Sequence, residues 1–143
     1  MITKILLGLC LGVPFTIINF SGYLKGNTPS IFQIFSSIVF LLLWLLWGLH
    51  YNYRNKGSTT FLKFSTLYWI SAFVFVFVMN GIDWIVFSIP TVIIFLGPLY
   101  GLRYYIPNVS YESFAYISLI VAYAISLIGS LLGYITNRSL AKK

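Results

Sequence analysis

Acidic side chains are almost absent from this sequence. Its 143 residues include only two, Asp83 and Glu112, against nine Lys and Arg, and charged residues of both signs make up 8%. A water-soluble domain has about a quarter charged residues, because its surface faces water. With 59% hydrophobic and 20% aromatic residues, the composition indicates a surface covered mostly by lipid. We therefore predict an all-α, polytopic protein of the cell membrane, with a single transmembrane domain over residues 1–143.

Cysteine and histidine are equally scarce. The single cysteine, Cys10, excludes an intrachain disulfide, and the single histidine, His50, has no second ligand at metal-binding spacing. One His, one Cys, one Asp and one Glu lie at different segments of the chain, so no triad, carboxylate pair or phosphate-binding loop is indicated. We expect a protein that is not an enzyme and that holds no metal and no cofactor.

The formal net charge of +7 does not indicate nucleic-acid binding. Such proteins gather Lys and Arg on one soluble face, whereas here these residues lie between and beyond the apolar runs. Basic residues at the ends of membrane helices orient the chain and meet anionic headgroups. The expected partner is therefore the lipid bilayer and not nucleic acid.

Long hydrophobic runs dominate what is present. Crossing the hydrocarbon takes about 20 helical residues, and a membrane strand would alternate polar and apolar residues, which FVFVFV at 73–78 does not. A helix satisfies its own backbone groups in lipid. We predict a bundle of five hydrophobic helices, the first an uncleaved span because no small-residue pair near Phe20 suits cleavage. The five apolar segments are about 5–20, 31–49, 61–79, 84–101 and 114–135.

The number of crossings has two interpretations. Hydropathy gives five, but with the N-terminus inside, five of the nine basic residues are then cytoplasmic and four are outside. Cytoplasmic connections normally carry a clear excess of Lys and Arg. If the fourth segment, interrupted by Pro90 and Gly97-Pro98, is broken or re-entrant and returns to the side it entered from, seven are inside and two outside. Both models, five crossings by hydropathy and four by charge, stay open at this point.

Small residues recur at helical spacing in the first and last segments. Both contain a GxxxG pattern, GLCLG and GSLLG, and small residues at this spacing let helix backbones approach closely in lipid. The motif does not say whether the neighbour belongs to this chain, to a second copy or to another membrane protein. The residues expected to pack helices are Gly8, Gly12, Ser118, Ala122, Ser126, Gly129 and Gly133.

A cluster of aromatic and basic residues follows the second segment. Rings beside Lys or Arg are typical of the headgroup zone of the bilayer. An interfacial position is expected, with an anionic lipid contact as the alternative. The cluster comprises His50, Tyr51, Tyr53, Arg54 and Lys56.

Asp83, Arg103 and Glu112 form a possible polar contact. In the four-crossing model all three lie outside, where Arg103 could pair with either carboxylate. In the five-crossing model Asp83 lies on the opposite side, and it then serves as the N-cap of the fourth helix, a common role for Asp.

Nearly the whole chain is apolar segment or short connection, which leaves no room for a soluble domain. We expect a small non-enzymatic accessory or immunity-type subunit that packs against a membrane partner or forms a homo-oligomer. The alternative is a small transporter or channel component that moves a solute by using the broken fourth segment, because transporters place broken helices at their binding sites.

Overall fold

Four long helices make up most of the computed structural model, which describes residues 2–55, 60–81 and 89–140. They are α1 (Ile2–Lys25), α2 (Ile31–Arg54), α3 (Thr60–Gly81) and α5 (Tyr111–Leu140). Each is long and apolar enough to cross a membrane. No strand occurs in the described ranges, so the prediction of an all-α protein with hydrophobic helices is confirmed.

Local polar residues set the helix ends, and the helices extend past the predicted apolar segments. Gly26, with φ of 64°, follows the last residue of α1, a left-handed position that glycine occupies without strain. Ser30 and Gln33 form a reciprocal capping box at the start of α2. The Ser110 hydroxyl accepts the Ser113 N–H before α5. The helices are therefore longer than the apolar segments, because capping residues lie at the end of α1 and at the starts of α2 and α5.

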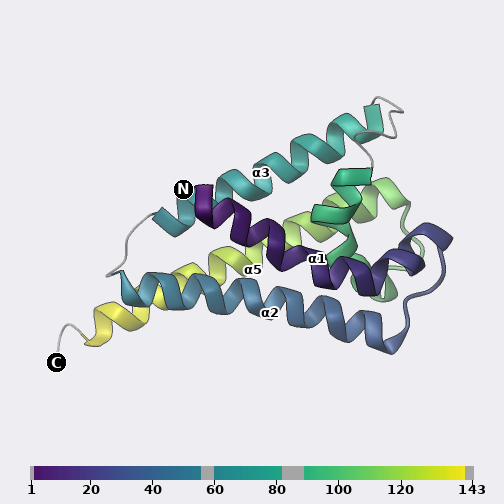
Figure 1. Cartoon of the computed structure of the whole chain (residues 1–143). Helices are drawn as coiled ribbons and strands as arrows, with labels where there is room; N and C mark the ends of the chain where they lie inside the picture. Colours follow the sequence, from purple (N-terminus) through teal and green to yellow (C-terminus); the bar gives the residue numbers. More distant parts are fainter. Residues whose placement is uncertain (1, 56–59, 82–88, 141–143) are drawn as a thin grey trace.

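The direction of each helix follows from its side-chain contacts (Figure 1). In α3 and α5, Phe73 stacks on Tyr116 while Thr66 contacts Tyr123, so these helices are antiparallel. In α2 and α5, the Asn52 side chain donates to the Ser130 carbonyl, and further along both helices Asn137 donates to the carbonyl of Tyr53. Helices α2 and α5 are therefore parallel, and α3 and α5 begin at opposite ends of the bundle.

The fourth segment is not one regular helix. Its described part contains a π-helix, η1 (Val92–Leu96), followed by a 3-10 helix, η2 (Gly97–Tyr105). The change falls at Gly97-Pro98, where Pro98 supplies no backbone donor. The helical backbone continues past the apolar segment that ends at about Gly101, as far as Tyr105.

This broken segment occupies only part of the length of the bundle. Pro90 and Thr91 border a cavity shared with Leu9 and Tyr68, partway along α1 and α3. From there the chain runs toward the end of the bundle where α1 ends, and Tyr100 packs edge-on against Tyr23. In Figure 1 the green ribbon of η1 and η2 lies between the long helices toward one end of the bundle.

Aromatic side chains fill the centre of the bundle. Trp44 of α2 is fully buried, and its indole lies within 6.5 Å, centroid to centroid, of several other rings. These rings come from α2 and α3, and they also contact Phe15 of α1 and Phe95 of η1. We call this set the aromatic core; it comprises Phe40, Trp44, Trp47, Phe64, Tyr68 and Trp69.

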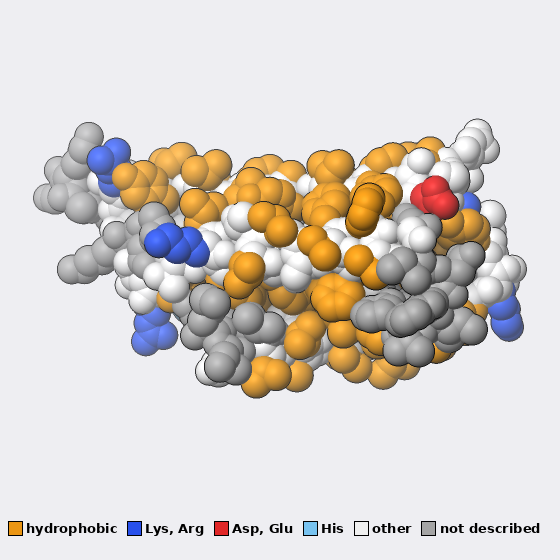
Figure 2. Space-filling model, turned by 90° about the horizontal axis from the view of Figure 1, so that it is seen from above, with side chains coloured by type: hydrophobic (Ala, Val, Ile, Leu, Met, Phe, Trp, Pro, Cys, Tyr) orange, Lys and Arg blue, Asp and Glu red, His pale blue; other side chains and the backbone are white. Residues whose placement is uncertain are grey.

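Hydrophobic side chains also cover the outside of the molecule. On the face shown in Figure 2 they form a band around the middle, with Lys and Arg side chains toward the two ends and an acidic side chain near one of them. Large aliphatic residues such as Ile17, Leu67 and Val74 point outward from α1 and α3. An apolar band between charged ends matches the hydrocarbon layer between two headgroup zones.

Candidate functional site

Gly129 and Gly133 lie against the backbone of α2. A Cβ on Gly129 would overlap the carbonyl oxygen of Leu45, and one on Gly133 would overlap that of Leu49. From the other side, a Cβ on Gly48 would come within 2.9 Å of the Ser130 nitrogen. The GSLLG motif therefore contacts a helix of its own chain.

The remaining small residues also face inward. A Cβ on Gly8 would lie 3.1 Å from the Tyr68 ring, and one on Gly12 would lie 3.0 Å from the Ile94 carbonyl oxygen. Ser118, Ala122 and Ser126 of α5 are all buried. The faces that carry these residues are therefore filled by α3, by the broken segment and by neighbouring helices of the same chain.

Buried hydrogen bonds also connect α5 to α2 and α3. Asn52 of α2 donates to the Ser130 carbonyl at 2.9 Å, and the indole N–H of Trp69 donates to the Ser126 hydroxyl at 3.0 Å. The Asn52 Oδ1 atom is buried and has no partner among the described residues. Ser126 was predicted only as a helix-packing residue. Its hydrogen bond could not be predicted, because no pattern in the sequence pairs it with Trp69.

The irregular backbone of the broken segment is held by polar side chains of α1 and α2. The Thr16 hydroxyl donates to the Ile93 carbonyl, and the Asn19 amide lies 3.4 Å from the Pro98 carbonyl. The Gly101 N–H donates to the Ser37 hydroxyl at 2.9 Å. Non-helical backbone at membrane depth requires such partners, because lipid offers none.

Buried polar atoms of α1 and α2 stay unpaired in the described structure. They include Asn19 Oδ1, whose amide group reaches the Pro98 carbonyl, and Ser36 Oγ. Thr16, Asn19 and Ser37 were not among the predicted site residues. The sequence does contain an indication of their role, because they are polar residues at helical spacing inside two otherwise apolar segments.

Among the described residues at this end of the bundle, Arg103 is the least exposed charged side chain. Its guanidinium carbon lies 3.7 Å from the centroid of the Tyr111 ring, and Nη2 lies 3.5 Å from the Val109 carbonyl oxygen. Nη1 is buried and has no hydrogen-bond partner within the described ranges. The side chain is thus held in one position while part of its hydrogen-bonding capacity stays unused.

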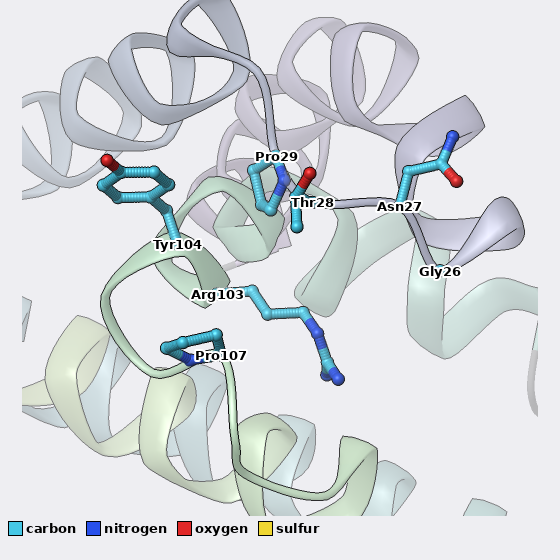
Figure 3. A pocket seen from close by; sticks show the side chains of 7 residues that line it. All are labelled: Gly26, Asn27, Thr28, Pro29, Arg103, Tyr104 and Pro107. Carbon is cyan, nitrogen blue, oxygen red and sulfur yellow. The ribbon is translucent and has the colours of Figure 1, made fainter.

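A cavity of about 400 Å³ opens beside Arg103. Its walls come from the connection between α1 and α2 and from the end of η2 with the turn that follows. In Figure 3 the Arg103 side chain extends between these two walls, with Pro29 on one side and Pro107 on the other. The lining residues are Gly26, Asn27, Thr28, Pro29, Arg103, Tyr104 and Pro107.

The structure brings Arg103 into a cavity but does not pair it with an acid. Glu112 is exposed, and no ion pair joins it to Arg103 in the part of the chain that the structure describes. Asp83, whether as a polar contact or as a helix cap, lies outside the described residues.

The predicted interfacial cluster lies at the other end of the bundle, where α2 ends. His50, Tyr53 and Arg54 are exposed, and Tyr51 packs against Phe61 with ring centroids 5.8 Å apart. Lys56 lies outside the described residues. This placement matches a helix end, and no further role follows from it.

Comparisons with protein-family models, with curated proteins and with solved structures found no match. The fold and the composition define a class, a helical protein with four helices able to span a membrane. Any more specific function must be argued from the geometry of this chain.

Proposed function

We propose that the chain crosses the membrane four times and that the segment between α3 and α5 returns to the side from which it started. The antiparallel α3 and α5 support this proposal. If the segment between them also crossed, α3 and α5 would run in the same direction. The cavity beside Arg103 adds support, because its walls come from residues 26–29 and 103–107, which five crossings would place on opposite sides.

Charge gives the orientation. Seven of the nine basic residues belong to the helix ends and connections on the side of both chain ends, and two, Lys25 and Arg103, belong to the other side. The positive-inside rule then puts both ends of the chain in the cytoplasm. The cavity beside Arg103 would accordingly face the outer side of the cell membrane.

For the activity, the best-supported function is that of a non-enzymatic accessory subunit. The observation that carries it is the aromatic core, in which Phe40, Trp44 and Phe64 are at most 1% exposed. Closely packed rings in the middle of a bundle obstruct the passage of a hydrated solute. The function is then exerted at the surface, by contact with lipid and with a membrane-protein partner or a second copy.

A small transporter or channel component is the second candidate. The buried polar atoms of Thr16, Asn19 and Ser37 around the broken segment favour it, because discontinuous helices with polar neighbours form the binding sites of many transporters. In this candidate the broken segment would have to move away from α1 to open a path.

Reconstitution separates the two candidates. The accessory function predicts that the purified chain in liposomes gives no flux of dyes, ions or small solutes above empty liposomes. It also predicts that a photo-crosslinking residue at Val74 or Leu67, both exposed on α3, yields one discrete protein adduct in cells. Solute flux that is lost in Asn19→Leu would instead establish the transporter candidate.

A further inference from the structure

We infer that the cavity beside Arg103 binds a phosphate group, either that of a phospholipid headgroup or that of a small soluble phosphate ester. The inference uses the proposed topology only to place the cavity on the outer side. Binding itself depends on the residues around Arg103 and can be measured without reference to topology.

The Arg103 guanidinium is incompletely hydrogen-bonded in the described structure. Its Nη1 atom is buried without a partner in the described structure, while Nη2 faces the Val109 carbonyl at 3.5 Å, a long contact. Leaving a charged donor buried and unpaired is costly. A phosphate in the cavity would lie beside this incompletely paired cation and offset its charge, and the planar guanidinium matches two phosphate oxygens at once.

The Arg103 side chain and the opposite wall of the cavity are preorganised for binding. The Tyr111 ring lies under the guanidinium at 3.7 Å, and the Phe114 ring centroid is 5.7 Å away. On the opposite wall, the Tyr100 hydroxyl donates to the Asn27 carbonyl and so fixes the connection after α1. A ligand would therefore meet a side chain and a wall that are already ordered, which lowers the entropic cost of binding.

The residues around the cavity are mainly apolar or cationic. Pro29, Tyr104 and Pro107 give the cavity apolar walls, and Lys25 lines a second cavity that also borders residues 27–28. Two cations therefore flank this connection, and the one acid described nearby, Glu112, is exposed and unpaired with Arg103. A cationic site with apolar walls at a membrane helix end suits the phosphate and glycerol part of a lipid.

The test is a titration of the purified full chain in a nonionic detergent. The probes are dihexanoyl phosphatidylglycerol, glycerol 3-phosphate, inorganic phosphate and, as a phosphate-free lipid, dihexanoylglycerol. Adducts are counted by native mass spectrometry, and stabilisation is read from the thermal midpoint. We expect phosphatidylglycerol to bind and dihexanoylglycerol not to bind. Tight binding of glycerol 3-phosphate as well would identify a soluble phosphate ester as the ligand class.

Variants assign the binding to Arg103. Replacing it in Arg103→Gln should weaken binding about 10- to 100-fold, the effect of losing a charge-assisted contact. Arg138→Gln is the matched control, because Arg138 also lies over a tyrosine ring, 5.2 Å from Tyr134, but is exposed at the far end of α5. It should change the affinity less than twofold.

Equal weakening in both variants would mean diffuse charge attraction and would overturn the assignment, as would unchanged affinity in Arg103→Gln. If Arg103→Gln does not fold, Thr28→Trp keeps the test decisive. Thr28 is exposed and lines the cavity, so tryptophan should block the site without disturbing the bundle. Normal affinity in folded Thr28→Trp would contradict the site.

Discussion

Phe73 of α3 stacks on Tyr116 of α5, with ring centroids 6.3 Å apart and planes inclined by 12°. Two helical turns earlier in α3, the Thr66 hydroxyl lies 3.1 Å from the hydroxyl of Tyr123, two turns later in α5. This pairing fixes the two helices as antiparallel neighbours. Since they are also successive long helices of the chain, the segment between them begins and ends at the same end of the bundle.

Filling the contact between α2 and α5 should destabilise the single chain. In Gly129→Leu the new side chain would meet the Leu45 carbonyl, and overpacking of this kind costs about 1–3 kcal/mol or more. We expect a lower thermal midpoint in detergent and less folded protein. Gly81→Leu is the control, because a Cβ on Gly81 meets nothing within 4 Å in the described structure.

The same variant distinguishes an internal contact from a contact between copies. Since Gly129 and Gly133 face α2, Gly129→Leu should lower stability without changing the molar mass by light scattering. A variant that stays as stable as the wild type but changes from dimer to monomer would contradict the internal role of GSLLG.

Removing the Asn52 side chain should weaken the same interface in another way. Asn52→Ala loses the bond to the Ser130 carbonyl, and hydrogen bonds between membrane helices contribute about 0.6 kcal/mol on average and up to about 1.7 kcal/mol. Unfolding in increasing denaturant measures the change. Asn108→Ala, at an exposed position between η2 and α5, should show no change, and an equal loss there would refute the assignment.

Ser37 should hold the end of the broken segment. In Ser37→Ala the buried Gly101 N–H loses its acceptor, which costs about 1–3 kcal/mol. Hydrogen exchange of the Gly101 amide should become faster, while the amides in the middle of α5 keep their protection. Ser113→Ala, on an exposed serine, serves as control. Unchanged exchange at Gly101 would show that other contacts hold this segment.

The sequence predicted the class and the main elements well. Apolar runs of near-bilayer length predicted the helices, because in lipid a helix is the only local way to satisfy the backbone. The basic residues favoured a fourth segment that returns, which stays a proposal, and the break expected at Gly97-Pro98 coincides with the change from π-helix to 3-10 helix. Small residues in the last segment predicted close helix contact.

The pairing of particular elements could not be predicted. GxxxG does not encode its neighbour, so nothing in the sequence assigned GSLLG to α2. Polar residues inside apolar runs, such as Asn19 and Ser37, find partners only through the path of the broken segment. Arg103 was predicted as part of a possible polar contact. Its cavity could not be predicted, because the opposite wall consists of residues 26–29, which are far away in sequence and come close only when α1 and η2 pack together.

The topology is the central claim, and cysteine labelling tests it most directly. In a Cys10→Ala background, Thr28→Cys, Tyr104→Cys and Ser139→Cys are treated in intact cells with a membrane-impermeant maleimide. All three positions are exposed in the structure. The account predicts labelling at positions 28 and 104, and at 139 only after permeabilisation. Labelling from outside at positions 28 and 139 but not at 104 would require five crossings and contradict the account.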